Sequence, residues 1–233
     1  MSQPTNRPRF EDPLQLVSRV VTKLFSLWIS VTYPFESIGR NVRFHPTSQL
    51  GRRRAIRIRL GNSVSVGKDA WLNVATQDPA GEPVIRIDDK CHIAYGAMIS
   101  AKNGIHLERE VLVGQQALIA DHNHAFEDVT MPIARQGVTA GGKIRIGQGS
   151  WIGHGAVIIC ARGTLTIGHN CIIGANTVVM QSIPDYSVAF GNPATIIKHY
   201  DQATRKWRIG ASRRAATRIS STSGRPVTDL IVK

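Results

Sequence analysis

Apolar residues in the middle of the chain recur at every sixth position, in groups of three. The regular groups are Leu60, Val66 and Leu72; Ile87, Ile93 and Ile99; Leu107, Val113 and Ile119; Ile146, Ile152 and Ile158; and Ile167, Ile173 and Val179. A looser group, Ile38, Phe44 and Leu50, precedes them. Four positions after these aliphatics stands a small or β-branched residue, such as Ala70, Cys91 or Cys171. Two positions of each hexad therefore have a restricted residue type: one is aliphatic, and the other is small or β-branched.

A period of six fits neither an α-helix nor a single two-sided strand, whose periods are 3.6 and 2. It fits a solenoid whose coil has three flat faces, with one hexad per face and the aliphatic side chains stacked inside. The small residues, including Cys91 and Cys171, then fill the other interior positions, where a buried cysteine behaves as a small hydrophobic residue.

The spacing between groups lengthens to 10, 15, 8, 27 and 9 residues, so extra residues must leave the coil at its corners. The longest interval runs from Ile119 to Ile146 and predicts an extruded loop over residues 120–145. We therefore expect an N-terminal segment over residues 1–37, a coil domain over 38–198 that carries this loop, and a basic tail over 199–233.

Residues 13–35, before the coils, have apolar residues at a 3-4-3-4 spacing, which predicts an amphipathic helix. Arg19 and Lys23 interrupt the apolar run, which is too broken for a membrane span. Its apolar stripe could pack on the coil or on a neighbouring subunit. It could also lie on a membrane surface, where an arginine run over residues 52–59 would meet lipid phosphates.

The 233-residue chain carries a net charge of +13, which predicts attraction to anions without choosing among them. No recognised nucleic-acid motif accompanies the charge, so we expect no nucleic-acid partner. Three scattered cysteines and no basic-then-apolar leader indicate a cytoplasmic protein with reduced thiols.

The predicted loop begins with the sequence IADHNHAFED, in which two histidines stand among three carboxylates. Imidazole has an ordinary pKa of about 6.5, so a loop histidine can take a proton from a hydroxyl near neutral pH. A solvated histidine without chemistry is the alternative from these residues alone.

Three runs in the later coils, KIRIGQGSWIGHGAVII, TIGHNCIIGANTVV and IPDYSVAFGNPATIIK, carry a resemblance to a known family. They resemble the hexapeptide-repeat acyltransferases, specifically the maltose, galactoside and polysaccharide O-acetyltransferase group. The resemblance implies a mainly β fold, a left-handed parallel β-helix, although most parallel crossovers are right-handed.

The resemblance also implies a reaction: direct transfer of an acetyl group from acetyl-CoA to a hydroxyl of a sugar or glycan precursor. Family members carry a catalytic histidine in an extruded loop, in a context that Asn123, His124 and Phe126 match. His124 is therefore the expected general base, with His122 in its place if the loop register differs by two. A backbone carbonyl, or one of the carboxylates of Asp121, Glu127 and Asp128, could orient the base.

For the donor, the resemblance places the pantetheine arm of acetyl-CoA along the last coils, beside Trp151, His154 and Ala175. The backbone N–H near His154 is the expected oxyanion donor, and Lys198 the expected partner of the nucleotide phosphates. The family usually forms homotrimers with active sites between subunits, and association would also cover flat apolar faces of the coil.

Two other classes compete with this interpretation. A carbonic anhydrase on the same coil would need three convergent histidines on zinc, for which the chain offers His122, His124, His154 and His169 but not that family's histidine spacing. We expect no metal. A solenoid scaffold without enzymatic activity is the other alternative.

Overall fold

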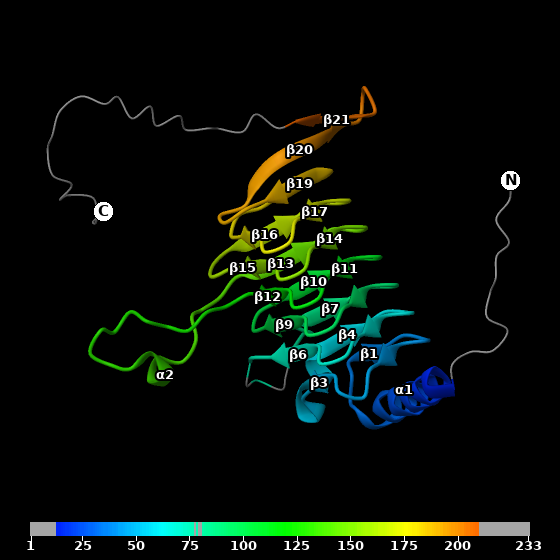
Figure 1. Ribbon diagram of the computed structural model, residues 1–233. Coiled ribbons are helices and arrows are strands. Elements are labelled where there is room, and N and C mark those ends of the chain that lie inside the picture. Colours follow the sequence, from blue (N-terminus) through cyan, green and yellow to red (C-terminus); the bar gives the residue numbers. More distant parts are fainter. Residues whose placement is uncertain (1–12, 77, 79–80, 210–233) are drawn as a thin grey trace, which may run out of the picture.

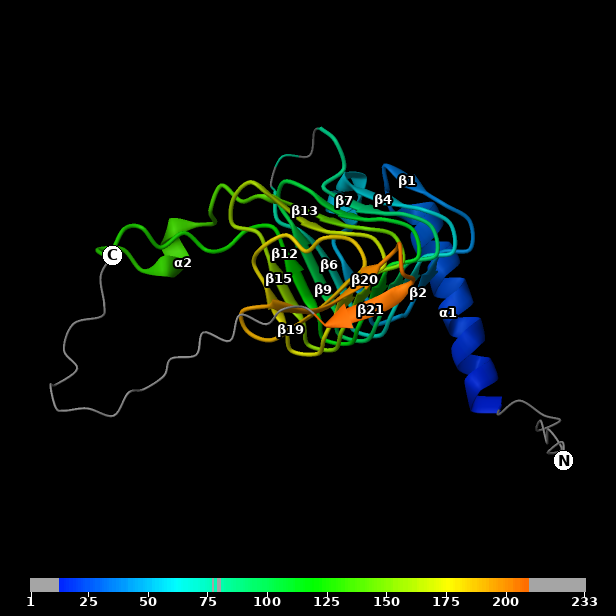
Figure 2. The ribbon, with the colours of Figure 1, turned by 90° about the horizontal axis from the view of Figure 1, so that it is seen from above.

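The computed structural model describes residues 13–76, 78 and 81–209, with side chains from residue 16 onward. The chain winds through three parallel sheets that form the faces of a triangular left-handed β-helix, so the predicted fold class is confirmed (Figure 1 and Figure 2). Each coil visits the sheets in turn, and we number them 1, 2 and 3 in that order. Corner 1–2, corner 2–3 and corner 3–1 lie between them.

The strands are short because each face of a coil is only a few residues wide. Sheet 1 contains β1 (Ser37–Ile38), β4 (Ile58–Leu60), β7 (Ile85–Ile87), β10 (Ile105–Leu107), β13 (Lys143–Ile146) and β16 (Thr164–Ile167). Sheet 2 contains β2 (Arg43–Phe44), β5 (Ser65–Val66), β8 (His92–Ile93), β11 (Leu112–Val113), β14 (Trp151–Ile152), β17 (Ile172–Ile173), β19 (Ser187–Phe190), β20 (Thr195–Asp201) and β21 (Lys206–Ile209). Sheet 3 contains β3 (Gln49–Leu50), β6 (Trp71–Val74), β9 (Met98–Ala101), β12 (Leu118–Ala120), β15 (Val157–Ile159) and β18 (Val178–Val179).

The aliphatic positions of the hexads stack on one another inside the coils. Ile87, for example, pairs in register with Leu60 in the preceding coil and with Leu107 in the following one. No residue of the five regular groups is more than 3% exposed, and the small residues such as Cys91 and Cys171 are equally buried. Each buried aliphatic side chain stabilises the fold by about 1.5–3 kcal/mol, so the repeat supplies the core directly.

Glycine follows many of these aliphatics because the backbones of successive coils approach closely at the corners. A Cβ at Gly147 would lie 2.6 Å from the carbonyl carbon of Gly168 in the next coil, and one at Gly153 would lie 2.6 Å from the carbonyl oxygen of Ile173. Backbone atoms cannot move aside as a flexible side chain would, so these corners exclude larger residues.

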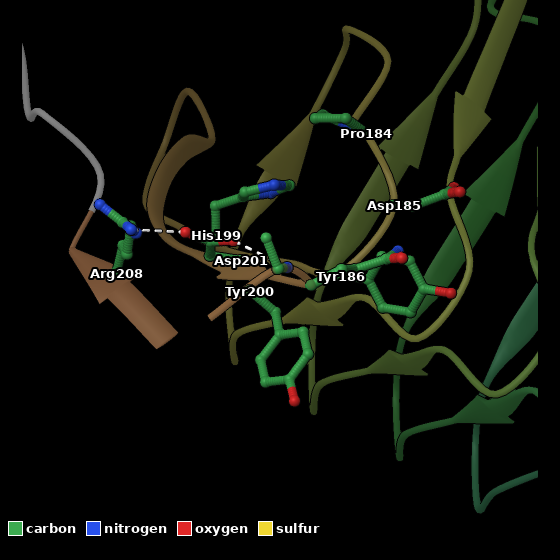
Figure 3. Close-up of a pocket in the computed structure, with 9 residues that line it drawn as sticks. Pro184, Asp185, Tyr186, His199, Tyr200, Asp201 and Arg208 are labelled. Atoms are coloured by element: carbon green, nitrogen blue, oxygen red, sulfur yellow. Dashed lines mark hydrogen bonds and ion pairs between the residues drawn. The ribbon is translucent and has the colours of Figure 1, made fainter. Parts of the chain in front are cut away.

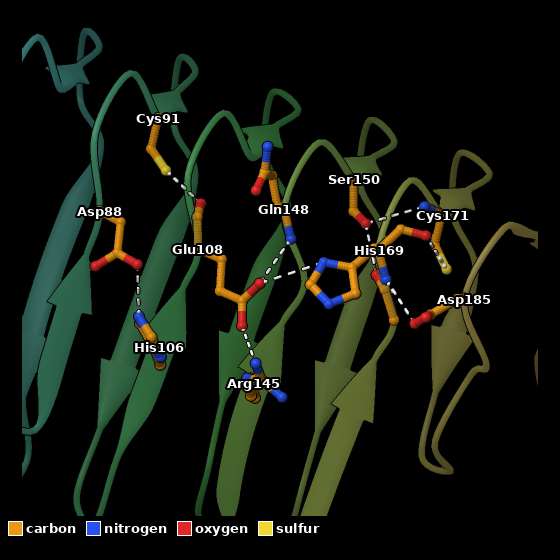
Figure 4. A network of polar contacts seen from close by, with 11 residues as sticks. Asp88, Cys91, His106, Glu108, Arg145, Gln148, Ser150, His169, Cys171 and Asp185 are labelled. Atoms are coloured by element: carbon orange, nitrogen blue, oxygen red, sulfur yellow. Dashed lines mark hydrogen bonds and ion pairs between the residues drawn. The ribbon is translucent and has the colours of Figure 1, made fainter.

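Polar side chains line corner 1–2 on its outer surface, as Figure 4 shows. The carboxylate of Glu108 forms ion pairs with Arg145 and, at 3.4 Å, with Nδ1 of His169. One coil earlier, Nε2 of His106 lies 2.9 Å from Oδ2 of Asp88. These partly exposed pairs connect neighbouring coils and contribute little each, because water screens them.

Helix α1 (Pro13–Thr32) lies at the N-terminal end of the coils (Figure 1). Ser26 and Ile29 are its buried residues, and Oγ of Ser26 accepts a 2.8 Å hydrogen bond from the backbone N–H of Phe44. The predicted apolar stripe lies on the other side, where Leu24 and Val31 are more than 60% exposed. The helix is thus confirmed, but the interpretation that its stripe packs on the coil is wrong, because serine hydrogen bonding sets the rotation of the helix.

The C-terminal end of the coils continues beyond the predicted boundary at residue 198. Strand β20 pairs antiparallel with β19, and β21 pairs antiparallel with β20, so residues 199–209 form a hairpin on sheet 2 instead of a free tail. Tyr200 and Trp207 meet in this hairpin with ring centroids 5.4 Å apart. Aromatic and β-branched pairs stabilise such strands although the local composition is basic. Residues 210–233 of the predicted tail lie outside the described residues.

Candidate functional site

The extruded loop leaves the coil at corner 3–1, between β12 and β13, and projects far from the coils in Figure 2. At its neck the carbonyl oxygen of Asp121 accepts the N–H of Gly142. Beyond the neck, Asn123 and Thr139 exchange hydrogen bonds, and His124 pairs with Val138 in an antiparallel bridge. A short two-stranded stem therefore positions the beginning of the loop. The one-turn helix α2 (Ile133–Gln136) lies near its tip.

Asp121 is the buried anchor of this neck, with no exposed surface. Its Oδ2 accepts the backbone N–H groups of Asn103 and Gly104 at 2.8 and 2.7 Å. Its Oδ1 accepts the N–H of Lys102 at 2.8 Å and lies 2.9 Å from Nδ1 of His122. Burial alone raises the pKa of Asp121, but these hydrogen bonds outweigh it and hold the pKa below its ordinary value. The carboxylate is therefore ionised at neutral pH.

His122 has one ring nitrogen held by Asp121 and a side chain that is 11% exposed. A carboxylate at Nδ1 keeps the proton on that nitrogen, which leaves the lone pair of Nε2 free to accept a proton. This is the orientation that a general base needs.

His124 is exposed, and its backbone belongs to the loop stem. Within the part of the chain that the structure describes, its imidazole has no hydrogen-bond partner. The other two candidate orienting groups are engaged elsewhere: Asp128 accepts from the N–H and hydroxyl of Thr130, and Glu127 accepts from the N–H of Phe126. Of the three candidate carboxylates, Asp121 is therefore the one in contact with a histidine, and that histidine is His122.

Two pockets flank the neck of the loop. One, of about 560 Å³, is lined by residues from coils before and after the loop, among them Lys102, Asn103 and Lys143. On the side of the later coils, a pocket of about 270 Å³ is lined by Asn123 and Met180 among others.

The expected donor-binding residues lie on sheet 2 and at corner 2–3. Trp151 is on β14 and is 48% exposed, and Lys198 is on β20. His154 and Ala175 are exposed at corner 2–3 in successive coils, where the carbonyl oxygen of His154 accepts the N–H of Asn176. These four positions mark the expected donor surface along the last coils.

This surface and the histidine loop do not meet within one chain. Sheet 3, including β12 and β15, lies between corner 2–3, with His154, and corner 3–1, with His122. The exposed apolar side chains of the loop also have no coil to cover them: Phe126, Val129, Met131 and Ile133 are each at least 42% exposed. The two sets of residues are therefore separated within the described part of one chain.

A third pocket, of about 960 Å³, lies beside the C-terminal hairpin (Figure 3). Tyr186, His199 and Tyr200 line it, and an ion pair between Arg208 and Asp201 closes one side at 2.6 Å. None of the six expected site residues lines this pocket. The pattern of hexads did not indicate it, because it is formed by the hairpin that follows the repeat.

The four histidines considered for zinc are dispersed over different corners. His122 and His124 belong to the loop, His154 lies at corner 2–3, and His169 pairs with Glu108 at corner 1–2. Among residues 13–76, 78 and 81–209, no group of three or more His, Cys, Asp or Glu side chains is arranged to hold a metal ion.

Sequence reasoning included Asp121 only as one of three carboxylates that could orient His124. Its burial and its hydrogen bonds to the preceding coil were missed. The available signal was its place directly after Ile119 and Ala120, where the chain is still part of the coil. A carboxylate at such a buried position must find donors, and the first free side chain next to it is His122.

Comparison with known proteins gives relatives in one functional class, although no protein-family model matches the chain. A Mycobacterium tuberculosis protein named as an acetyltransferase, Rv3034c, is 32% identical over 178 residues, which cover 76% of this chain and 53% of the relative. The chain thus spans about half the length of that relative. Escherichia coli WbbJ, named as a lipopolysaccharide biosynthesis O-acetyl transferase, is 29% identical over 64% of this chain and 79% of its own length.

Among solved structures, AntD from Bacillus cereus, an N-acyltransferase in complex with dTDP and coenzyme A, matches with a TM-score of 0.59. The match covers 77% of this chain and 90% of AntD at 19% identity, so it shows a common fold. The sequence matches and the three-faced coil together confirm the resemblance found in the repeats: this chain is a relative of the hexapeptide-repeat acyltransferases.

Proposed function

We propose that the protein transfers an acetyl group from acetyl-CoA to a hydroxyl of a sugar or glycan precursor, with His122 as the general base. The observation that carries the proposal is the buried Asp121 carboxylate on Nδ1 of His122. Among the named relatives, WbbJ is matched over most of its length and is an O-acetyl transferase by name, which supports a hydroxyl as the acceptor.

The chemistry follows from this geometry. Nε2 of His122 takes the proton of the acceptor hydroxyl while the oxygen attacks the thioester carbonyl. A backbone N–H near His154 holds the tetrahedral oxyanion. When the carbon–sulfur bond breaks, the imidazolium returns the proton to the leaving thiolate. The products are the acetyl ester and free coenzyme A, and Asp121 stabilises the imidazolium in between.

We further propose that the active site forms between two copies of the chain in a cyclic homotrimer. One copy supplies His122 from corner 3–1, and its neighbour supplies the donor surface with Trp151, His154, Ala175 and Lys198. The separation of these surfaces by sheet 3 supports this arrangement. Apolar loop residues such as Phe126 would then be covered by the neighbour.

Two histidine variants test the assignment of the base. His122→Ala is expected to lower kcat by about 10²-fold or more, the usual contribution of a general base. His124→Ala, a matched change two residues away, should lower it much less. Release of the coenzyme A thiol with a panel of sugars and nucleotide sugars measures turnover. A larger loss in His124→Ala would assign the base to His124 instead.

Binding of acetyl-CoA separates an enzyme from a scaffold without knowledge of the acceptor. A ligand at 100 times its dissociation constant adds about 2.7 kcal/mol of stability and raises the unfolding midpoint. We expect the same rise in wild type and His122→Ala, because the base does not hold the donor. No rise in wild type at saturating acetyl-CoA would contradict the proposed function and favour a scaffold.

Refolding two inactive variants together tests the shared site. His122→Ala lacks the base, and Ala175→Trp is designed to block the donor surface. If the two residues act from different copies, mixed trimers regain activity that neither variant has alone. An inactive mixture of trimers would contradict a site shared between copies.

A further inference from the structure

The surface of α1 that faces away from the coils is its apolar face. The outward residues are all between 47% and 76% exposed: Leu16, Val17, Val20, Val21, Leu24, Leu27, Trp28 and Val31. We call this set the α1 stripe. The inward face is less apolar and includes Thr22, Ser26 and Ser30. Surface helices normally bury the apolar face, so this helix has the reverse orientation.

Side-chain hydrogen bonds fix that orientation. Oγ of Ser26 accepts the N–H of Phe44 at 2.8 Å and contacts the carbonyl oxygen of Thr22 at 2.6 Å. Ile29, 1% exposed, packs into the core one turn later. Turning the α1 stripe toward the coil would break these contacts and leave the backbone N–H of Phe44 without its partner, which is unfavourable for a buried donor. The stripe is therefore held outward.

Basic residues border the α1 stripe, and the helix sequence has no acidic residue. Arg19 and Lys23 lie one turn apart beside the stripe. At the C-terminal end of α1, Nε of Arg52 donates to the carbonyl oxygen of Thr32 at 3.1 Å. Arg52 begins a 3-10 helix, Arg52–Arg57, in which Arg53 is also exposed. Figure 1 shows this cyan helix and α1 at the same end of the coils.

We propose that this end of the protein binds the surface of an anionic phospholipid membrane through the α1 stripe. A helix with an exposed apolar face and flanking Lys and Arg lies in the interface, with its aliphatic side chains among the acyl chains. The basic residues meet lipid phosphates, and each adds to the attraction of the protein to an anionic surface. No described helix is long and apolar enough to cross a membrane.

Charge favours a lipid surface over a second copy of the chain on the stripe. A two-fold contact through α1 would bring Lys23 and Arg52 of both copies to one interface, where no acidic residue of α1 neutralises them. An anionic bilayer neutralises the same charges and accepts the apolar side chains. The inference does not depend on the reaction proposed above.

Co-sedimentation of the full chain with vesicles tests the proposal. Wild type should sediment with vesicles of phosphatidylcholine and phosphatidylglycerol, and less with phosphatidylcholine alone. Leu24→Glu, on the stripe, should lower the partition coefficient at least about tenfold, because the leucine side chain would no longer be buried among the acyl chains. Ile209→Glu is the matched control, because Ile209 is 85% exposed at the opposite end of the coils. The partition coefficient of this variant should differ little from that of wild type.

Trp28 provides a second readout, because it is half exposed on the stripe. Its emission should shift to shorter wavelength when vesicles are added, and Trp28→Phe should remove that shift while it retains binding. Equal partition of wild type and Leu24→Glu would overturn the proposal. A second result would also overturn it: wild type does not bind vesicles, and Leu24→Glu has a lower oligomeric mass than wild type. That result would assign the stripe to a contact with a second copy.

Discussion

Replacing Asp121 with asparagine tests whether an ionised carboxylate at the loop neck serves both the fold and the base. The substitution keeps the size of the side chain but leaves one oxygen in place of two. Asp121 accepts two donors on each oxygen: Asn103 and Gly104 on one, Lys102 and His122 on the other. In either orientation of the amide, two donors therefore face its NH₂ group.

The expected loss of stability follows from these two contacts. A hydrogen bond to a charged group contributes about 1.5–3 kcal/mol, so the unfolding free energy of Asp121→Asn should fall by roughly 3–6 kcal/mol. If the NH₂ group faces His122, Nδ1 must accept and the proton moves to Nε2. The base is then in the wrong tautomer, and kcat should fall by about 10²-fold or more.

The assay is urea unfolding followed by circular dichroism, together with turnover in the folded variant. Asp88→Asn is the matched control, because Asp88 also lies 2.9 Å from a histidine at a corner. That pair is 36–44% exposed, so its loss should change stability by no more than about 1 kcal/mol. Equal stability and equal kcat in wild type and Asp121→Asn would refute the reasoning.

Three further outcomes are expected. The pKa of Asp121 is lower in the folded protein than in the unfolded chain, where it is about 3.9. The contribution of Asp121 to the unfolding free energy is therefore complete above that unfolded value and is lost as the pH falls through the folded pKa. Unfolding free energies measured at decreasing pH should show this loss in wild type and not in Asp121→Asn. Burial raises the pKa of Cys91 to about 12, so a thiol reagent at neutral pH should leave it unmodified in the folded protein and modify it in urea. Gly153→Ala should destabilise the fold by about 1–3 kcal/mol, because its Cβ would meet backbone atoms, whereas Gly51→Ala meets only a side-chain atom at 3.9 Å and should be nearly neutral in the same unfolding measurement.

The coils could be predicted from the sequence because every hexad buries its aliphatic residue in the same way. Leu107 occupies the same slot as Ile87 before it and Ile146 after it, so one aliphatic per face recurs in register. The C-terminal hairpin has no such repeat. Its strands are held by antiparallel pairing between β19, β20 and β21, which the basic composition of residues 199–209 concealed.

The orientation of α1 illustrates a different limit. Its apolar periodicity predicted the helix correctly, but periodicity shows only that one face differs from the other. Which face meets the coil depends on Ser26 and Ile29, and the hydrogen bond from Phe44 to Ser26 joins residues 18 positions apart. A contact between the helix and a later strand cannot be inferred from the pattern of the helix alone.

The choice between His122 and His124 shows why the site was harder to predict than the coils. Side chains two residues apart on an extended segment point to the same side, so the alternation of side chains along a strand could not distinguish His122 from His124. What separates them is the end of the coil: Asp121 still has the backbone N–H groups of the preceding coil to bind, whereas His124 has only the opposite stem strand. The repeat thus favours His122 as the proposed base indirectly, because the last buried position before the insertion is where a charge can be held, and His122 is the residue whose imidazole contacts that charge.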